Sequence, residues 1–331
     1  MPKGLNSQLK MTETTPDPVF PSVTMHAVRP NAPVVARVHA SVPATSSRAA
    51  GIVRHVEIDV SGTPLEGTFR AGQSFGVVPP GQTPSGKPHG VRLYSIASPT
   101  QGEDGAGKIL ATTTKRVISE FADPEDADRH DLFLGVCSNH LCDLRPGDEV
   151  LVAGPNGKGF LLPESPEVHN YIFLATGTGI APFRGFLKEL LEGESPCESK
   201  ILLMLGVPWE TDLLYRDELE ALAANHDNLE LRWSISREQH HPDRGPYVHD
   251  RLKREWSELE ERFTDPNAMI YACGLAGMQV GVFRLLAQQG LTEQYLKIRD
   301  EETSAMDPSE WDAARIKRYV RPGARTKLEV Y

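Results

Sequence analysis

Short runs of alternating apolar and polar residues fill the chain from residue 34 to about residue 163. The runs are separated by stretches rich in glycine and proline, which is the pattern of half-buried antiparallel strands joined by turns. We expect these strands at 34–42, 52–60, 74–78, 91–97, 109–115 and 150–153. Six strands of this kind predict a small antiparallel β-barrel.

The pattern changes after Pro163 to continuous apolar runs that alternate with amphipathic segments. Continuous apolar runs are typical of buried parallel strands, and their alternation with helices is typical of βαβ units. We expect strands at 171–175, 200–205, 229–236 and 268–272, and helices at 183–192, 213–224, 248–262 and 278–289. The predicted fold class is therefore two-domain: an antiparallel β-barrel domain over residues 34–163, followed by an α/β doubly wound parallel-sheet domain over residues 164–331.

Two other segments lack any apolar period. Residues 1–33 are rich in proline, serine and threonine, and we expect them to form a flexible N-terminal tail. Residues 119–132 carry six acidic side chains and are expected to be irregular, solvated surface. Nothing resembles the apolar core of a secretory signal or a membrane span of about 18 apolar residues. We therefore expect a cytoplasmic protein, with a plastid as the alternative location.

Charge and cysteine content narrow the function. The 331 residues carry a net charge of -10, which argues against nucleic-acid binding because that function needs a basic surface. Four cysteines are too few for a disulfide scaffold. Cys137 and Cys142 are spaced like the start of an iron–sulfur motif, but no Cys-x-x-Cys follows them. We predict no metal site.

One predicted strand combines three kinds of side chain that a flavin needs. In Arg92-Leu93-Tyr94-Ser95, alternation places Arg92 and Tyr94 on one face. A guanidinium can bind a pyrophosphate through two hydrogen bonds, and a tyrosine ring can lie against an isoalloxazine. The Ser95 hydroxyl can reach the reactive nitrogen of that ring system. These four residues alone fit a flavin site and an ordinary amphipathic strand equally well.

A glycine-containing turn follows the first predicted parallel strand and leads into a helix. In Thr176-Gly177-Thr178-Gly179, the glycines allow the backbone to approach a pyrophosphate, and the helix N-terminus favours negative charge. An ordinary strand-to-helix turn is the alternative interpretation. The fourth parallel strand ends at Cys273, where a thiol can contact a nicotinamide ring or simply be a small buried side chain.

The end of the third parallel strand carries Ser236 and Arg237, and Tyr247 lies ten residues beyond. A serine hydroxyl and an arginine fork suit the 2′-phosphate of NADP, and a tyrosine can stack on its adenine. The second strand ends at 206–208 without the acidic residue that often binds the ribose hydroxyls of NAD. This pattern favours NADP over NAD, and a solvent-facing loop arginine is the alternative.

Taken in order, these motifs resemble plant-type ferredoxin–NADP reductases over about residues 31–331. The stretches that carry the resemblance are 72–74, 86–89, 92–98, 135–139, 141–144, 178–183, 236–239, 273–275 and 329–331. The resemblance implies an FAD-binding barrel and an NADP-binding domain. It also implies hydride exchange with NADP(H) and one-electron exchange with ferredoxin or flavodoxin, by an enzyme that we expect to be a monomer.

The resemblance also implies roles for individual residues. The residues expected to hold the flavin are Arg92, Leu93, Tyr94, Ser95, Thr113, Thr114, Lys115, Val136, Cys137 and Ser138. The residues expected to bind NADP are Thr178, Val207, Pro208, Ser236, Arg237, Tyr247, Gly274 and Leu275. The residues expected at the hydride-transfer site are Ser95, Cys273, Glu329 and Tyr331, with the Tyr331 ring on the isoalloxazine face that the nicotinamide must occupy.

The chain departs from the family pattern at two ligand positions. Ser119 replaces the aromatic residue that the family places on the flavin adenine, and Phe121 is our candidate to take over that role. Gly245 replaces a lysine that precedes the adenine-stacking tyrosine, and Arg244 could supply its charge.

A basic segment offers a surface for an acidic electron carrier despite the negative net charge. Between Trp311 and Tyr331 the cations are Arg315, Lys317, Arg318, Arg321, Arg325 and Lys327. Our hypothesis is that these residues, together with Arg116 and Arg145, receive the carrier. An ordinary solvated helix face is the alternative.

Two other functions remain open at this point. The reductase component of an oxygenase is built on the same module, and it often carries an iron–sulfur domain for which this chain lacks the cysteines. A nucleotide-binding module without turnover is the second alternative, although Ser95, Cys273, Glu329 and Tyr331 are all present.

Overall fold

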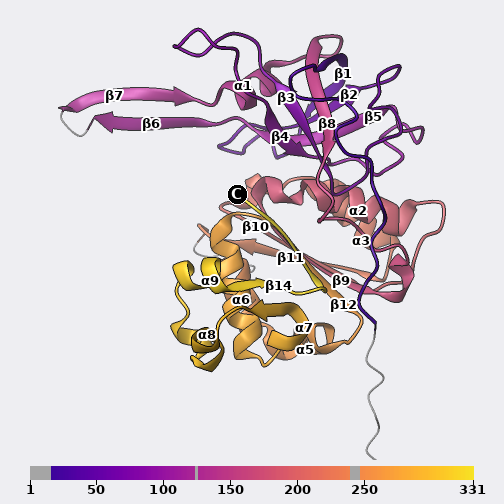
Figure 1. The fold of residues 1–331 in the computed structure, drawn as a ribbon, viewed down its shortest axis with the longest axis vertical. Helices are drawn as coiled ribbons and strands as arrows, with labels where there is room; N and C mark the ends of the chain where they lie inside the picture. Colours follow the sequence, from indigo (N-terminus) through magenta and orange to yellow (C-terminus); the bar gives the residue numbers. More distant parts are fainter. Residues whose placement is uncertain (1–15, 124–125, 239–246) are drawn as a thin grey trace, which may run out of the picture.

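The computed structural model describes residues 16–123, 126–238 and 247–331. Figure 1 shows two bodies, one above the other, with the antiparallel strands in the upper body and the parallel sheet with its helices in the lower one. The last residues of the chain lie where the two bodies meet (Figure 1). This arrangement confirms the predicted fold class, a barrel followed by a doubly wound α/β sheet.

All six predicted strands of the upper body are present. They are β1 (Val34–Pro43), β2 (Val53–Asp59), β3 (Ser74–Val78), β4 (Arg92–Ser95), β5 (Ile109–Lys115) and β8 (Glu149–Asn156). They form one antiparallel sheet in the order β4-β3-β8-β1-β2-β5, and a bridge between Ile96 and Thr112 joins its two edges. Alternate side chains point inward and form a core that includes Val56, Ile58 and Phe75.

The acidic stretch at 119–132 is not irregular, so that expectation was wrong. It lies almost entirely in an antiparallel hairpin of β6 (Ile118–Asp123) and β7 (Asp126–Leu134), which projects from the barrel (Figure 1). Cross-strand pairing of Ile118 with Leu134 and of Ser119 with Phe133 forms its base. The many acidic residues give this stretch no apolar period that would predict strands. Its strands form because the backbones of β6 and β7 pair with each other. Helix α1 (Val136–Asp143), which we did not predict, follows directly.

The lower body contains the four predicted parallel strands and a fifth that we did not predict. The strands are β9 (Asn170–Thr176), β10 (Ile201–Val207), β11 (Leu229–Ile235), β12 (Ala268–Gly274) and β15 (Thr326–Val330), in the order β11-β10-β9-β12-β15. β15 is only five residues long and partly polar, so its sequence alone gives little strand signal. It places the C-terminal residues beside the carboxyl end of β12.

Helices cover both faces of this sheet. They are α2 (Ala181–Glu192), α3 (Arg216–Asn225), α4 (Val248–Arg254), α5 (Trp256–Thr264) and α6 (Ala276–Gln288). The first two pack with Tyr171 and Phe173 in one core, and the last three pack with Ile172 and Leu174 in another. Alternate residues of β9 therefore face opposite helical layers. The expected helix 248–262 is two helices, because the backbone leaves helical geometry at Glu255.

Shorter elements complete the description. They are α7 (Thr292–Tyr295), α8 (Glu301–Ala305), α9 (Ala313–Tyr319), the antiparallel pair β13 (Leu296–Ile298) and β14 (Val320–Pro322), and the 3-10 turns η1 (Pro166–Val168), η2 (Gly177–Ile180), η3 (Glu210–Asp212) and η4 (Pro308–Glu310). Within the described ranges, no helix is long and apolar enough to cross a membrane. Location in the cytoplasm stays a prediction.

Arg184 of α2 joins the two bodies. Its buried guanidinium donates to Glu103 at 2.5 and 3.2 Å, to the Ala97 carbonyl at 3.1 Å and to Glu218 at 2.9 Å. Hydrogen bonds between charged groups are stronger than neutral ones, and these groups are largely shielded from solvent. The contact to Ala97 holds the chain two residues beyond Ser95.

A second set of polar contacts lies beside Arg184. The Tyr215 hydroxyl forms hydrogen bonds with His55 Nδ1 at 2.9 Å and with the Thr113 hydroxyl at 2.5 Å. Tyr215 therefore links the lower body to β2 and β5. His55, Glu57 and Glu103 bring potential metal ligands within 4.8 Å of one another. Glu103 already forms an ion pair with Arg184, so this cluster is an ion-pair network between the two bodies.

Residues 16–33 do not behave as a flexible tail, which corrects that part of the prediction. Val28 is buried and pairs with Gly154 of the barrel, and the Thr24 carbonyl accepts a hydrogen bond from Gln73. At the other end, the Pro16 carbonyl accepts from Arg325. The sequence of this segment shows no helix or strand period. Its backbone groups bond instead to other parts of the molecule. Residues 1–15 lie outside the described chain.

Candidate active site

A cavity of about 810 Å³ lies between the barrel and the carboxyl edge of the parallel sheet. Its walls come from β4, β5, the base of the β6–β7 hairpin, the start of α1, the turn η2 and the C-terminus. The predicted site residues that line it are Arg92, Leu93, Tyr94, Ser95, Thr113, Thr114, Lys115, Val136, Cys137, Ser138, Thr178, Glu329 and Tyr331. The structure therefore brings the expected flavin residues and most of the expected hydride-transfer residues to one place.

Strand β4 supplies the aromatic and cationic wall of this cavity. Arg92 is exposed, while Tyr94 is half-buried against Cys137. Burial raises the pKa of the Tyr94 hydroxyl, and burial also raises the pKa of the Cys137 thiol, so both are neutral near pH 7. The strand thus presents a neutral ring beside a positive charge.

The start of α1 forms the neighbouring wall. Gly135 precedes the helix, and a β-carbon there would meet the Ser138 oxygen at 2.6 Å and the Val117 β-carbon at 2.9 Å. The Ser138 hydroxyl accepts from the Val117 amide at 3.2 Å and donates to the Gly135 carbonyl at 3.1 Å. The free N–H groups of the first helical turn favour an anion. Together with Arg92, this wall suits a ligand that carries a pyrophosphate beside a flat ring, as a flavin dinucleotide does.

The opposite wall belongs to the C-terminus. The Ser95 hydroxyl donates to Glu329 Oε2 at 3.4 Å, and the hydroxyls of Tyr331 and Thr178 are 2.7 Å apart. Burial raises the pKa of Glu329, and the Ser95 hydrogen bond opposes that rise only in part. A carboxyl group with a raised pKa is suited to hold a proton near neutral pH.

Cys273 lies behind this wall and does not appear among the residues that line the cavity. It is 1% exposed and pairs in register with Glu329 across the strands β12 and β15. Burial and the neighbouring Glu329 raise the pKa of its thiol well above the ordinary value. The thiol is therefore neutral, and its contact with a nicotinamide stays a prediction.

The two glycine turns at the sheet edge are packed against each other. A β-carbon at Gly179 would lie 2.2 Å from the Cys273 carbonyl oxygen, and one at Gly274 would lie 2.1 Å from Thr176 Oγ1. The Thr176 hydroxyl instead accepts a hydrogen bond from the Leu275 amide at 2.7 Å. Both positions require glycine, because the two turns approach each other closely through their backbones.

The remaining predicted NADP residues cluster at the ends of β10 and β11. The amides of Ser236 and Arg237 donate to the carbonyls of Val207 and Pro208 at 3.0 and 2.8 Å. The Arg237 side chain is exposed at this edge. These contacts hold the segments that follow β10 and β11 side by side.

Tyr247 is exposed at the start of α4 and lies parallel to the His249 ring, with ring centroids 5.7 Å apart. We did not predict this contact, because a histidine two residues after the tyrosine carries no sequence signal. The expected contributions of Arg244 and Gly245 lie outside the described residues, and so does the side chain of Phe121.

Several cations of the expected basic surface are buried or already paired in the structure. Arg325 is buried, Arg315 pairs with Glu302 at 2.9 Å, and Lys327 packs 3.6 Å from the centre of the Phe20 ring. Arg116 pairs with Asp143, and the Arg145 guanidinium donates to the carbonyls of Cys142, Asp143 and Leu144. These side chains already have partners within the molecule, and their positions in the sequence do not reveal those partners.

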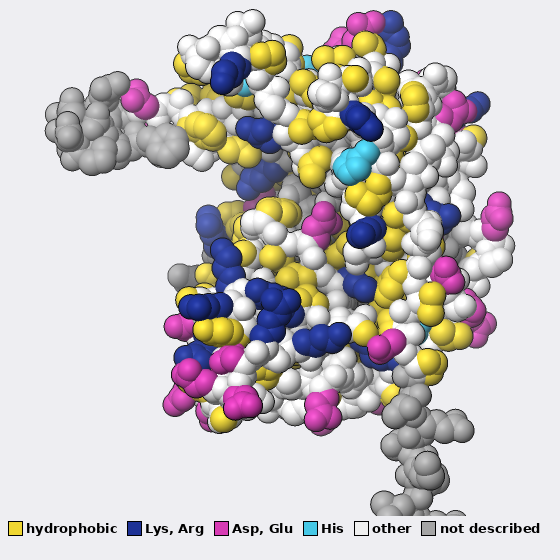
Figure 2. Space-filling view, viewed as in Figure 1, with side chains coloured by type: hydrophobic (Ala, Val, Ile, Leu, Met, Phe, Trp, Pro, Cys, Tyr) yellow, Lys and Arg dark blue, Asp and Glu magenta, His cyan; other side chains and the backbone are white. Residues whose placement is uncertain are grey.

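Two cations that we did not predict, Lys297 and Arg299, lie beside the remaining ones. Lys297 lies in β13 and Arg299 follows it directly, and the pairing of β13 with β14 places Lys297 opposite Arg321. We define the basic patch as Lys297, Arg299, Lys317, Arg318 and Arg321. Figure 2 shows Lys and Arg side chains gathered on this side of the lower body. Three patch residues line a cleft of about 710 Å³ that also reaches Glu329.

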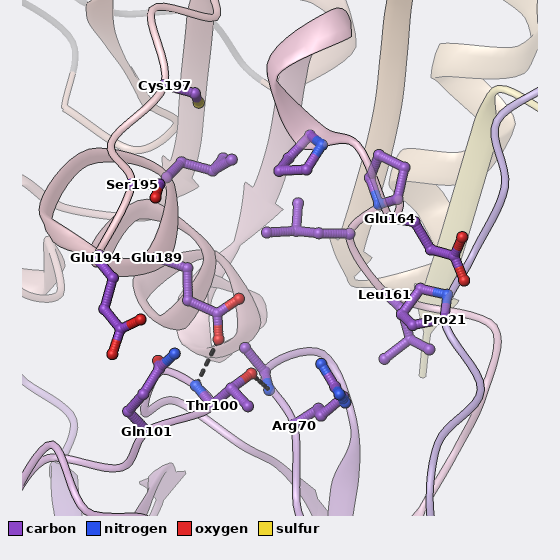
Figure 3. Close-up of a pocket in the computed structure, with 16 residues that line it drawn as sticks. Pro21, Arg70, Thr100, Gln101, Leu161, Glu164, Glu189, Glu194, Ser195 and Cys197 are labelled. Atoms are coloured by element: carbon purple, nitrogen blue, oxygen red, sulfur yellow. Dashed lines mark hydrogen bonds between the residues drawn. The ribbon is translucent and has the colours of Figure 1, made fainter.

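A separate pocket of about 430 Å³ lies beside the end of α2 (Figure 3). Glu189 points into it and accepts a hydrogen bond from the Thr100 amide at 2.5 Å, and burial raises the pKa of its carboxyl group. Arg70 lies across from it in Figure 3. None of the predicted site residues lines this pocket, and its polar contacts hold α2 against the barrel.

Comparison with known proteins agrees with a site for two dinucleotides. The family model described as "Oxidoreductase NAD-binding domain" matches residues 173–283. The ferredoxin–NADP reductase of Thermosynechococcus vestitus is 38% identical over 265 residues, which cover 78% of this chain and 67% of that protein. The chloroplastic leaf isozyme 1 of Arabidopsis thaliana is also 38% identical, over 78% of this chain and 71% of the plant protein.

The share of a relative's own length that this chain covers differs from one relative to another. A Spirulina ferredoxin–NADP reductase is 37% identical, with 78% of this chain and 87% of that protein covered. The chain spans only 64% of the Picosynechococcus relative. The solved ferredoxin–NADP+ reductase of Plasmodium falciparum shares the fold with a TM-score of 0.66 at 23% identity, over 93% of this chain and 99% of that one. The chain therefore belongs to the ferredoxin–NADP reductase family.

Proposed function

We propose that this chain is an FAD-dependent ferredoxin–NADP(+) reductase. The observation that carries the proposal is the convergence of Ser95 from the barrel with Glu329 and Tyr331 from the second body at one cavity. The family assignment supports the same activity. Bound FAD supplies hydride exchange with NADP(H) and single-electron exchange with a protein carrier.

The barrel residues fit FAD. Arg92 and the first turn of α1 would bind the pyrophosphate, and Tyr94 would lie against the isoalloxazine. Leu93, Thr113, Thr114, Lys115, Val136, Cys137 and Ser138 complete the walls of that site. When Glu329 is protonated, it would donate its hydrogen bond to the Ser95 oxygen, and the single Ser95 proton would then be donated to the reacting edge of the ring. Glu329 would hold or release the accompanying proton.

The second body fits NADP(H). Ser236 and Arg237 would bind the 2′-phosphate, with Val207 and Pro208 as the neighbouring loop and Tyr247 against the adenine. Thr178, Gly274 and Leu275 would bind the pyrophosphate end at the glycine turns.

The Tyr331 ring would occupy the place that the nicotinamide must take and would act as a gate. Its hydroxyl bond to Thr178 holds it in that place until the nicotinamide displaces it. Cys273 would contact the nicotinamide only after this displacement, because it is buried behind the C-terminal strand.

The basic patch supports an acidic protein as electron carrier. Complementary charge raises the rate at which two proteins meet and orients them. The patch adjoins Glu329 through the cleft, so a carrier bound there lies close to the flavin cavity. Ferredoxin is the carrier named by the relatives, and flavodoxin is a second candidate of the same charge. We expect the enzyme to act as a monomer.

One experiment separates this function from its alternatives. The purified protein should be yellow and should lose its flavin colour under anaerobic NADPH. NADPH-driven cytochrome c reduction should then rise on addition of ferredoxin or flavodoxin. A protein that stays oxidised would contradict the proposal and favour a nucleotide-binding module. Bleaching with no response to either carrier would favour the reductase component of an oxygenase.

A further inference from the structure

The hairpin contributes one aromatic side chain to the flavin cavity. Phe133, near the end of β7, lines the cavity with Val117 and Val136, although it was not among the predicted site residues. The Phe133 side chain is 46% exposed. Large apolar side chains that stay exposed beside a cavity mark a binding surface more often than isolated ones do.

The register of the hairpin explains what the ring can contact. Phe133 pairs directly with Ser119, so both side chains point to the same face. The Ser119 side chain is small, so the residue directly opposite Phe133 does not itself extend over the ring. The neighbouring Leu132 and Leu134 point to the opposite face because side chains alternate along a strand.

The position of Phe133 in the chain identifies the part of the ligand that it would meet. It stands two residues before Gly135, which opens the helix turn assigned to the FAD pyrophosphate. In the proposed FAD site, Tyr94 and Ser95 would contact the isoalloxazine, which is one of the two groups joined by the pyrophosphate. The group that continues beyond the pyrophosphate is the adenosine, and its flat purine is suited to stack on an aromatic ring.

We propose that Phe133 supplies the aromatic surface for the adenine of FAD, in place of a side chain at position 119. This inference rests on the proposed function, since it assigns one more residue to the same FAD site. Phe121, whose side chain lies outside the described part of the chain, stays the alternative candidate for that role. The surface recognises a purine ring and makes no contact that FMN, which lacks the adenosine, could use.

The test compares FAD with FMN on the full chain after removal of its flavin. In Phe133→Ala, we expect the dissociation constant for FAD to rise about tenfold and the constant for FMN to stay unchanged. Phe133→Tyr keeps the ring and should retain the affinity for FAD. Leu132→Ala is the matched control, because that side chain is 65% exposed on the opposite face of the same strand.

Three results would overturn the inference: equal losses of FAD and FMN in Phe133→Ala, no loss of either, or a loss in Leu132→Ala as large as in Phe133→Ala. Equal losses would mean that the ring only shapes the cavity. Failure of the unaltered protein to bind FAD would instead overturn the proposed function itself, so the two failures are distinguishable.

Discussion

The Ser95 hydroxyl donates a hydrogen bond to Glu329 Oε2 across 3.4 Å, although 234 positions separate the two residues in the chain. Ser95 ends strand β4 of the barrel, and Glu329 lies in the last strand of the parallel sheet. The two bodies therefore meet at this pair. Arg184 reinforces the meeting point because it binds the carbonyl of Ala97, close to Ser95.

Removal of the Ser95 hydroxyl should slow hydride transfer. We expect Ser95→Ala to reduce the rate of flavin reduction by NADPH about 10- to 100-fold, because the hydroxyl that connects Glu329 to the reacting ring is lost. Ser95→Thr keeps the hydroxyl and should retain most of the rate. Stopped-flow absorbance of the flavin measures both. An unchanged rate in Ser95→Ala would remove this residue from the hydride-transfer site.

Glu329 should make stability depend on pH in a specific direction. Because burial raises its pKa, the folded protein binds this proton more tightly than the unfolded chain does. Its stabilising contribution is complete below the unfolded pKa and is lost as the pH rises through the folded pKa. Glu329→Gln stays neutral throughout, so the Tm difference between Glu329→Gln and the unaltered protein should become more positive from about pH 4 to about pH 8.

Calorimetric unfolding over that pH range measures this difference, with exposed Glu310→Gln as the control substitution. A Tm difference that is constant with pH would show that Glu329 has no perturbed ionisation. A difference that becomes more negative would show that the carboxylate form is the one stabilised by folding.

Truncation of the C-terminal ring should tighten nicotinamide binding. An aromatic stack is worth about 0.5–1.5 kcal/mol, so its loss in Tyr331→Ser should lower the Kd of NADP+ by about 2- to 12-fold and slow its release. Tyr331→Phe keeps the ring and loses only the bond to Thr178, so its affinity should stay closer to that of the unaltered protein. Titration by difference absorbance measures both. Weaker binding in Tyr331→Ser would contradict the gate.

Arg237 should set the preference for NADPH over NADH. A hydrogen bond to a charged group contributes about 1.5–3 kcal/mol, so Arg237→Ala should reduce the ratio of kcat/KM for the two coenzymes by about 10- to 100-fold. Arg37→Ala, at an exposed arginine of the barrel, is the control. Steady-state kinetics with both coenzymes give the ratio. If it does not change, Arg237 does not bind the 2′-phosphate.

Charge reversal in the basic patch should weaken the encounter with an acidic carrier. We expect Lys317→Glu with Arg318→Glu to raise the KM for ferredoxin and to reduce its dependence on salt, because fewer charges remain to attract the carrier. Arg37→Glu with Lys108→Glu reverses two exposed charges on the barrel as a control. Carrier-dependent cytochrome c reduction at several ionic strengths measures the effect. Equal behaviour of the two double variants would place the carrier elsewhere.

The local elements could largely be predicted from the sequence. The six barrel strands and the first four parallel strands follow from periods of two residues and from continuous apolar runs, because burial of one or both faces determines which residues a strand can use. The hairpin at 118–134 and the strand at 326–330 were missed, since their stability depends on pairing with a neighbouring strand that a local pattern does not contain.

The sequence by itself also determined the chemical types at the site, because the residues at 92–95 and the glycine turn at 176–179 are contiguous motifs. Only the tertiary structure decided how these motifs combine. β15 brings Glu329 to Ser95, and the hairpin brings Phe133 opposite Ser119. Contacts between residues far apart in the chain arise from packing of whole elements, so local periodicity specifies the parts but not which side chains meet.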